Sequence, residues 1–325
     1  MKFKLIQSCL LLACSTLLYA DNCSIPKQRF DWENKYCGDV GPNCILQWKG
    51  YGWWTNFHAN PKGYFFESNQ AYDPRNVSVD PEGRLKLEIK QSDLGGGMGW
   101  SAAEAVLVSR GQEPVNIGYG QYLVTVEVPR AVENVQNIDP ATVFGAFTYY
   151  RKQEGGKDIG ASGTENNLAE LDMIELSKWG WTESNSKNKE EKCPFTGAMR
   201  EYGCSGLAQL GAQPWTVANN LVRFSIPEPT SMLTFYMEWK KDKVVYKVFN
   251  GDIDVNEAAS KDGDIYNWPL SNKTFIPSPD EGCIRFHLNF YRPVYSPDGP
   301  SISKIPSEGK NYIYVRDFDY VPAPY

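Results

Sequence analysis

The order of apolar and polar residues along the chain predicts β-strands almost throughout. In the segment RLKLEIK, residues 84–90, every second residue is apolar, so the aliphatic side chains share one face and the charged ones the other. A period of two is that of a half-buried strand. Further apolar or alternating runs predict strands at 105–109, 120–128, 142–150, 221–226, 235–239, 244–249, 284–290 and 312–321. Residues 98–106 and 165–180 also fit short helices, which are too brief to change the fold class.

Turn signals separate these predicted strands. Examples are Asp80-Pro-Glu-Gly83 and the pair Lys241-Asp242, whose residue types favour tight turns. Many short strands joined by turns are typical of an antiparallel β-sandwich or jelly roll. The sequence contains no internal repeat, low-complexity linker or heptad pattern. We therefore expect an all-β protein with one domain at 46–325, preceded by a cysteine-bearing segment at 21–45.

The first residues, MKFKLIQSCLLLACSTLLYADNC, have the layout of a secretory signal peptide. Lys2 and Lys4 precede an apolar run that ends in small residues, and the predicted cleavage follows Ala20, giving a signal peptide at 1–20. An alternative takes Leu-Leu-Ala-Cys as a lipoprotein signal in which Cys14 carries the lipid. No later run approaches the roughly 18 apolar residues of a membrane helix. We therefore expect an exported protein, secreted or periplasmic, without stable membrane insertion.

Removal of the signal peptide would leave an even number of cysteines, which suits disulfides in an oxidising compartment. They are Cys23, Cys37, Cys44, Cys193, Cys204 and Cys283. Six cysteines allow many pairings, and the sequence does not choose among them. The preferred local pair is Cys193 with Cys204.

Composition limits the classes of partner. The formal net charge is −6 with a pI near 5.2, and lysine and arginine form no patch along the sequence. Proteins that bind nucleic acid usually concentrate these residues, so a nucleic-acid partner is not expected. The chain also holds 10 Trp, 19 Tyr and 15 Phe. Such rings suit a large core and also suit stacking on sugars, and most of them must be core.

The segment LAELDMIELSKWG, residues 168–180, places Glu170, Asp172 and Glu175 within six positions. On a regular strand Glu170 and Asp172 would share a face, and Glu175 would point the other way. A bulge in which Met173 and Ile174 take the space of one residue would return Glu175 to that face. We therefore predict a bulged strand with three carboxylates on one side.

Two carboxylates roughly 5–5.5 Å apart are the apparatus of a retaining glycosidase. Glu170 would attack the anomeric carbon, and Glu175 would act as the acid and then the base. Asp172 would hold a hydrogen bond to Glu170. A solvated acidic face is disfavoured by the apolar residues between the acids, and a calcium site is disfavoured because such sites usually use a flexible loop.

With the acids placed in this way, the sequence resembles glycoside hydrolase family 16, the laminarinase and lichenase group. The family motif Glu-x-Asp-x-(x)-Glu stands here as Glu170-Leu-Asp172-Met-Ile-Glu175. IGYGQYLVTVEVP, TVFGAFTYY, FYMEWKKDKVVYKVFNGD, IRFHLNFY and RDFDYV also resemble family strands and follow in the family's order. The resemblance covers about residues 46–322. It implies a concanavalin-like jelly roll of two antiparallel sheets with a concave substrate cleft, and an endo-acting β-glucanase that requires no cofactor.

The sequence departs from the family pattern in three places. Leu233 stands where many members have His, and Tyr291 stands where Trp is usual. Residues 182–220 have no counterpart that aligns. The substrate is therefore left open between a β-1,3-glucan, a mixed β-1,3/1,4-glucan and a galactan.

The resemblance also implies residues that contact the sugar chain in the cleft. Taken alone, each aromatic candidate is more often a packing residue than a sugar platform. The aromatic candidates are Tyr149, Trp179, Trp181, Tyr291, Trp53 and Trp54, and the hydrogen-bonding candidates are Glu104 and Asn289. Family members often hold a structural calcium on the convex side, where the carbonyl of Gly83 and the carboxylate of Asp319 would match.

Other chemistries fit less well. GGGMG at 95–99 lacks the Lys-Ser/Thr continuation of a phosphate-binding loop. Only His58 and His287 are present, so a histidine-rich zinc site and a serine triad are disfavoured. Two alternatives to hydrolysis stay open: a transglycosylase that uses the same acids, and a non-catalytic carbohydrate-binding protein on the same fold. The expected partner is a polysaccharide, and the protein is expected to be a monomer.

Overall fold

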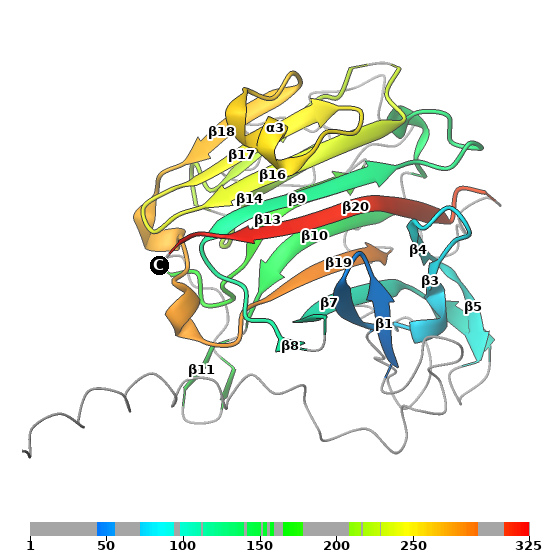
Figure 1. The fold of residues 1–325 in the computed structure, drawn as a ribbon, viewed down its shortest axis with the longest axis horizontal. Coiled ribbons are helices and arrows are strands. Elements are labelled where there is room, and N and C mark those ends of the chain that lie inside the picture. Colours follow the sequence, from blue (N-terminus) through cyan, green and yellow to red (C-terminus); the bar gives the residue numbers. More distant parts are fainter. Residues whose placement is uncertain are drawn as a thin grey trace, which may run out of the picture.

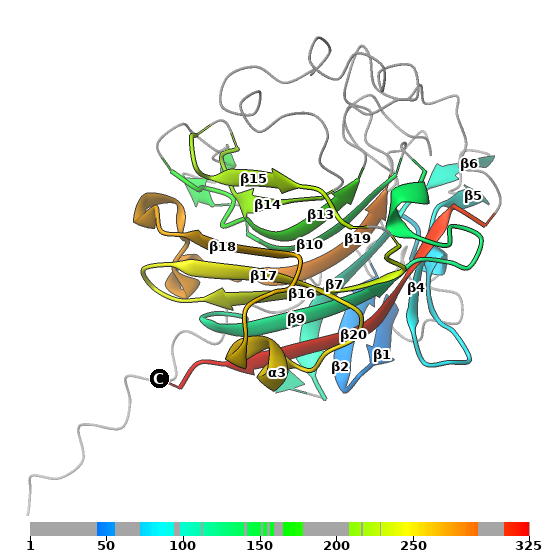
Figure 2. The same ribbon diagram turned by 90° about the horizontal axis from the view of Figure 1, so that it is seen from above.

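Two large antiparallel sheets, one stacked on the other, dominate the structure, which is a computed structural model (Figure 1). Figure 2 shows the two layers from above. The structure describes residues 44–55, 72–93, 98–111, 113–139, 142–150, 152–154, 157–158, 165–177, 208–215, 217–227, 229–291 and 309–324.

In the described part of the chain, the first sheet has nine strands and carries the candidate site. Its order is β1 (Ile45–Trp48), β2 (Tyr51–Thr55), β7 (Ala103–Arg110), β19 (Arg285–Tyr291), β10 (Val143–Tyr149), β13 (Leu171–Ser177), β14 (Ala208–Ala212) and β15 (Leu221–Phe224), with β8 (Glu113–Pro114) beside β7. Strands far apart in the sequence, such as β7 and β19, are therefore neighbours.

The second sheet has seven strands among the residues that the structure describes. Its order is β18 (Tyr266–Leu270), β17 (Val244–Asn250), β16 (Met232–Trp239), β9 (Gly120–Glu127), β20 (Tyr312–Pro322), β4 (Leu85–Glu88) and β3 (Val77–Val79). Every strand pair in both sheets is antiparallel. The predicted all-β jelly-roll sandwich is thus confirmed.

Smaller elements complete the described structure. Two short hairpins pair β5 (Lys90–Asp93) with β6 (Met98–Ser101) and β11 (Gln153–Glu154) with β12 (Lys157–Asp158). The helical elements are α3 (Val255–Ser260), η5 (Pro74–Asn76), η6 (Val135–Asn137), η7 (Lys273–Phe275) and η8 (Pro279–Glu281). The sequence of residues 98–106 and 165–180 also fitted short helices. In the structure, the described parts of these two ranges contain the strands β6, β7 and β13 instead.

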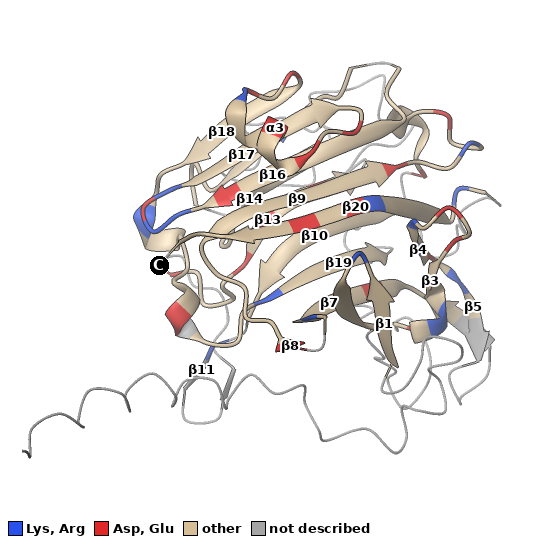
Figure 3. Cartoon of the chain, viewed as in Figure 1, with Lys and Arg blue, Asp and Glu red and all other residues tan. Residues whose placement is uncertain are grey.

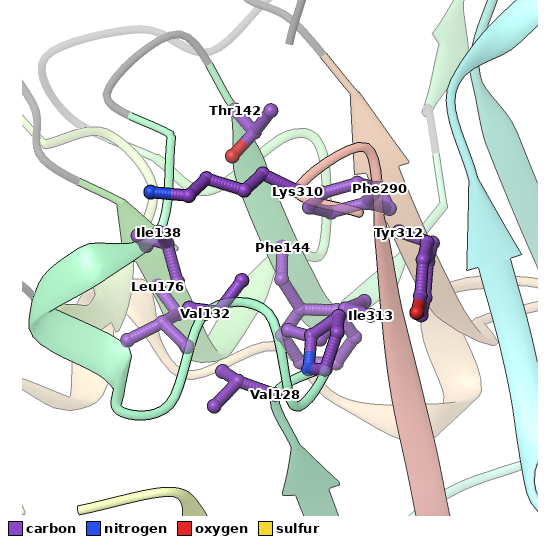
Figure 4. A pocket seen from close by; sticks show the side chains of 11 residues that line it. Val128, Val132, Ile138, Thr142, Phe144, Leu176, Phe290, Lys310, Tyr312 and Ile313 are labelled. Atoms are coloured by element: carbon purple, nitrogen blue, oxygen red, sulfur yellow. The ribbon is translucent and has the colours of Figure 1, made fainter. Parts of the chain in front are cut away.

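The core lies between the sheets and is built by alternate residues of each strand. Leu85 and Leu87 on β4 are fully buried, whereas Lys86 and Glu88 between them are only half-buried. A small apolar pocket remains between the layers, and Figure 4 shows the side chain of Lys310 lying across it. Its lining belongs to the same core, because Phe144, Leu176 and Ile313 are all buried. The pocket is therefore a packing gap of the sandwich.

The predicted turns are present. The amide of Gly83 donates to the carbonyl of Asp80 at 2.9 Å, and Gly83 has a φ of 79°. Glycine is favoured there because that backbone region crowds a Cβ. The hairpin from β16 to β17 is closed by a bond of 3.0 Å from the Lys240 amide to the Lys243 carbonyl.

Both signs of charge are interspersed over the second sheet, as Figure 3 shows. Arg84, for example, pairs with Asp80 at 2.7 Å and with Glu127 at 3.0 Å.

Among the described residues, no helix has the length and apolar character needed to cross a membrane.

Several sequence predictions fall on residues that the structure does not describe. The signal peptide at 1–20, nearly all of the segment at 21–45 and the Cys193–Cys204 pair lie outside the described residues. Cys44 and Cys283, the cysteines of the described part, are both disulfide-bonded.

Candidate active site

A β-bulge interrupts β13 between Asp172 and Glu175. Along β10, Phe147 lies opposite Asp172 and Ala146 lies opposite Ile174, so Met173 is the extra residue on that side. Along β14, the neighbour on the other side of β13, the register also shifts between Asp172 and Glu175. The predicted bulge is therefore present.

The bulge decides where the β13 side chains point. The apolar residues of the strand belong to the core between the sheets; they are Leu171, Met173, Ile174 and Leu176. Asp172 and Glu175 alternate with them and so lie on the other face of the sheet, which we call the outer face. Both carboxyl residues are nevertheless buried, with 2% and 5% of their surface exposed.

Glu170 precedes β13 and is held by its backbone. Oδ1 of Asn166 accepts from the Glu170 amide at 3.1 Å, and Nδ2 of Asn166 donates to the Glu170 carbonyl at 3.0 Å. The amide of Gln213 donates to the same carbonyl at 3.2 Å. Ala169 has a φ of 45°, an uncommon conformation for a residue with a side chain. Local strain beside a residue held so firmly is typical of functional sites.

Each carboxyl has its own donors. Nε2 of Gln213 lies 3.4 Å from Oε1 of Glu170, and the indole nitrogen of Trp215 donates to Oδ2 of Asp172 at 2.9 Å. Glu170 and Asp172 also share a hydrogen bond. This bond agrees with the expectation that Asp172 orients Glu170.

Glu175 is contacted from both sides. Nε2 of Gln209 donates to its Oε2, and the hydroxyl of Tyr291 lies 3.5 Å from its Oε1. The two oxygens therefore have different neighbours. Tyr291, predicted as a sugar platform, contacts the carboxyl directly.

Burial and mutual repulsion hold protons on these acids. Burial is the larger cause and the charge of Glu175 the smaller one, and together they raise the pKa of Glu170 to about 7. Burial and the charge of Asp172 raise the pKa of Glu175 to about 8. Burial and Glu170 also raise the pKa of Asp172 well above its usual range. Crowded carboxylates cannot all ionise cheaply, so Glu175 is the stronger proton holder of the two glutamates.

Polar side chains continue across the sheet from Glu175. Strand register places six residues side by side on β7, β19, β10, β13, β14 and β15, and we call them the polar row: Glu104, Asn289, Gly145, Glu175, Gln209 and Arg223. Five strand spacings make the row roughly 24 Å long. It is long enough to lie along an extended chain-like ligand.

The predicted hydrogen-bonding residues are in this row. Asn289 has 6% of its surface exposed, and the described part of the chain offers its Oδ1 no hydrogen-bond partner. Oε1 of Glu104 lies 3.1 Å from Nδ1 of His287. A buried polar atom without a protein partner is well suited to receive a ligand hydroxyl.

The predicted aromatic residues separate into three groups. Tyr149 and Trp54 are half-buried on the outer face, and the ring of Tyr149 meets His287 edge-on at 5.7 Å. Trp53 is fully buried in the core, with its ring 4.9 Å from that of Phe318. Its assignment to the sugar-binding face is therefore wrong, because adjacent residues of a strand point to opposite faces. Trp179 and Trp181 lie outside the described residues.

The residues expected to hold calcium already have protein partners. The carbonyl of Gly83 accepts from the Trp48 indole at 2.8 Å, and Oδ1 of Asp319 lies 3.4 Å from the Tyr51 hydroxyl. In the part of the chain that the structure describes, no three His, Cys, Asp or Glu side chains form a metal-binding group. These two oxygens alone do not make a calcium cage. Calcium binding stays a prediction, and no chemical step depends on it.

Sequence reasoning missed the residues that surround the acids. Gln209, Gln213, Trp215 and Arg223 come from β14, the turn after it, and β15. The first three fall within 182–220, which aligned with no family strand. The alternation of AQLGA at 208–212 is a weak signal because the segment is short and lacks β-branched residues.

No family model matches the sequence, and no curated protein matches it. Solved structures that resemble it include a β-1,3-1,4-glucanase (lichenase) from a mouse hindgut metagenome, with 14% identity and a TM-score of 0.46 over 86% of this chain and 97% of that one. The Bacillus licheniformis β-glucanase has 15% identity and a TM-score of 0.47, covering 85% and 94%. The κ-carrageenase of Pseudoalteromonas carrageenovora, in complex with a κ-carrageenan oligotetrasaccharide, has 13% identity and a TM-score of 0.43, covering 83% and 89%.

Proposed function

We propose that this protein is a retaining endo-acting glycoside hydrolase whose substrate is a β-linked glucan. One observation carries the proposal: the bulge in β13 brings Asp172 and Glu175 to one face, beside Glu170, and the acids differ in how firmly they hold a proton. Pairs of carboxyls whose pKa values are pushed apart are the usual acid and nucleophile of glycosidases.

The roles follow from the partners of each acid. The Glu170 carboxylate attacks the anomeric carbon and forms a bond to it. At the same time the bond between that carbon and the glycosidic oxygen breaks, and the electron pair of the broken bond goes to the departing oxygen. The proton of Glu175 moves to that oxygen. Glu175 then removes a proton from water, which attacks the same carbon and releases Glu170. Asp172, bonded to Trp215 and Glu170, fixes the orientation of the nucleophile.

The shape of the outer face favours a polymer over a small sugar. Glu104 and Asn289 of the polar row lie side by side on β7 and β19, and the rings of Phe147 and Tyr149 stand beside them on β10. Aromatic faces and aligned polar groups suit stacking on successive sugar rings and binding their hydroxyls. A glucan with β-1,3 or mixed β-1,3/1,4 linkages is the proposed substrate, and export through the N-terminal signal would bring the enzyme to it.

The test is product analysis on β-1,3-glucan, mixed-linkage glucan and galactans. The wild-type chain should release oligosaccharides from one or more of the glucans. Glu170→Gln should retain less than about 1% of this activity, because covalent catalysis has no ready substitute for its nucleophile. Glu257→Gln, an exposed acid on α3, is the matched control and should keep full activity. A wild-type enzyme that acts on none of these glycans, or an active Glu170→Gln, would contradict the proposal.

A further inference from the structure

Three side chains of the polar row form a hydrogen-bonded chain that ends on Glu175. Nε of Arg223, on β15, donates to Oε1 of Gln209 at 2.9 Å. Nε2 of Gln209, on β14, donates to Oε2 of Glu175 on β13. All three residues are buried, with 8%, 1% and 5% of their surface exposed. The Gln209 amide therefore links Arg223 to the carboxyl of Glu175 by hydrogen bonds.

The chemistry of arginine fixes the direction of this chain. A guanidinium has hydrogen-bond donors and no acceptor, so the oxygen of the Gln209 amide must face Arg223. The amide nitrogen of Gln209 must then face Glu175, where it can only donate. Oε2 of Glu175 is consequently an acceptor, and a proton on Oε2 would clash with the donated N–H.

We propose that Arg223 is a positioning residue for the acid/base carboxyl: through Gln209 it keeps Oε2 of Glu175 as an acceptor and so holds the acid proton on Oε1. This inference rests on the proposed function for its catalytic meaning. Oε1 is the oxygen that meets the hydroxyl of Tyr291, on β19. The proton is thereby presented away from Gln209 on β14 and toward the Tyr291 hydroxyl on β19.

Among the described residues, the charged or titratable groups that act on Glu175 come from three strands and the segment of Glu170. Asp172 and Glu170 lie on the same segment, Arg223 faces it from β15 and the Tyr291 hydroxyl from β19. Gln209 on β14 is neutral, and Gly145 on β10 has no side chain. Of the groups named here, Arg223 alone is cationic, and together with the Gln209 hydrogen bond it opposes the rise in the pKa of Glu175 that burial and Asp172 cause. Arg223 thus limits how tightly the acid holds its proton.

A purely structural role for Arg223 makes a different prediction. If Arg223 only joined β14 to β15, its loss would lower stability and reduce cleavage of every substrate alike. If it positions the proton, its loss should matter only where the leaving group needs that proton. Substrates that differ in leaving group therefore separate the two roles.

The experiment compares Arg223→Met with wild type on a β-glucan oligosaccharide and on the corresponding 2,4-dinitrophenyl glycoside. The sugar leaving group needs protonation, so kcat/KM on the oligosaccharide should fall about tenfold or more. Dinitrophenolate departs without a proton, so kcat/KM on that substrate should change less than about threefold. Arg84→Met, a largely buried arginine of the second sheet, is the control and should show no such difference between substrates.

A second variant covers the case in which Arg223→Met does not fold. Gln209→Met removes the same donor to Glu175 while keeping the length of the side chain, and it should give the same difference between substrates. Because both residues act through one chain, Arg223→Met should add little in the Gln209→Met background. An equal loss on both substrates in either variant would overturn the proposal.

A measurement without substrate separates this inference from the proposed function. Titration of Glu175 by ¹³C NMR, assigned by the signal missing in Glu175→Gln, should have a higher midpoint in Arg223→Met, since a nearby positive charge is lost. If the wild-type protein is inactive on every glycan but the Glu175 midpoint is still higher in Arg223→Met, the proposed function is refuted and the positioning role of Arg223 stands. An unchanged midpoint would overturn the positioning even in an active enzyme.

Discussion

Oδ1 of Asn289 lies over Gly145 on the neighbouring strand, 2.5 Å from where a Cβ of residue 145 would stand. The absence of a side chain at 145 lets the Asn289 amide lie across β10. Gly145 is also opposite Glu175. A glycine in the middle of this strand thus brings a polar group from β19 toward the acid on β13.

Gly145→Ala should weaken substrate use while sparing the fold. The new methyl group would push away the end of a flexible side chain, which costs little stability, but Oδ1 of Asn289 would leave its place. The loss of one hydrogen bond to a sugar hydroxyl corresponds to about a five- to tenfold fall in kcat/KM. Steady-state kinetics and thermal melting measure the two effects.

Asn289→Ala provides the background that tests this explanation. With the amide gone, Gly145→Ala has nothing to displace and should cause no further loss of activity. Equal effects of Gly145→Ala in both backgrounds would show that the methyl group acts on something other than Asn289.

Hydrolysis should retain the β configuration of the cleaved bond. This outcome is expected if the Glu170 and Glu175 carboxyls lie roughly 5–5.5 Å apart, as in double displacement. Proton NMR in the first minutes of hydrolysis distinguishes the anomers before they equilibrate. Initial release of the α-anomer would instead mean an inverting mechanism.

The pH dependence of kcat/KM should be bell-shaped, with its maximum between about 7 and about 8. Glu170 must be ionised to attack, so activity rises with pH through its pKa. Glu175 must be protonated to assist departure, so activity falls as pH rises through its pKa. On a dinitrophenyl glycoside, which needs no acid, Glu175→Gln should lose the alkaline limb. An alkaline limb that survives in this variant would belong to another group.

Glu175→Gln should also make the fold more stable, and more so at high pH. The pKa of Glu175 is about 8 in the folded chain, against an ordinary value of 4.5. The folded state therefore keeps a proton that the unfolded state releases, and stability falls as pH rises from 4.5 to about 8. The gain in Tm from Glu175→Gln should be small at about pH 4 and should exceed about 2 °C at about pH 9. Thermal melting of Glu257→Gln is the control, and a gain independent of pH would argue against the buried charge as its cause.

Cys193 and Cys204 are predicted to form a disulfide that closes a loop following β13, the strand that carries Glu175. Such a bridge restricts the loop, which would border the bound sugar chain. Replacing both cysteines with Ser should change the preferred chain length more than the rate on a short substrate. Peptide mapping under non-reducing conditions tests the pairing, and a Cys193–Cys283 bridge or a free thiol would rule it out.

The sequence by itself determined most of the long strands and the three acids. Leu85 and Leu87 are buried as their alternation predicted, because a period of two is a local property of the chain. The bulge was also predictable, since Glu170, Asp172 and Glu175 can share a face only if Met173 and Ile174 take one place. Both inferences need only neighbours in the sequence.

The tertiary structure alone decided which side chains surround the acids. Trp53 and Trp54 are adjacent in the sequence, and the register of β2 against β7 sends only Trp54 to the outer face. Gln209 and Arg223 come to Glu175 because β14 and β15 pair beside β13. Such contacts depend on strand pairing between distant segments, and a shift of one residue would turn every side chain to the other face.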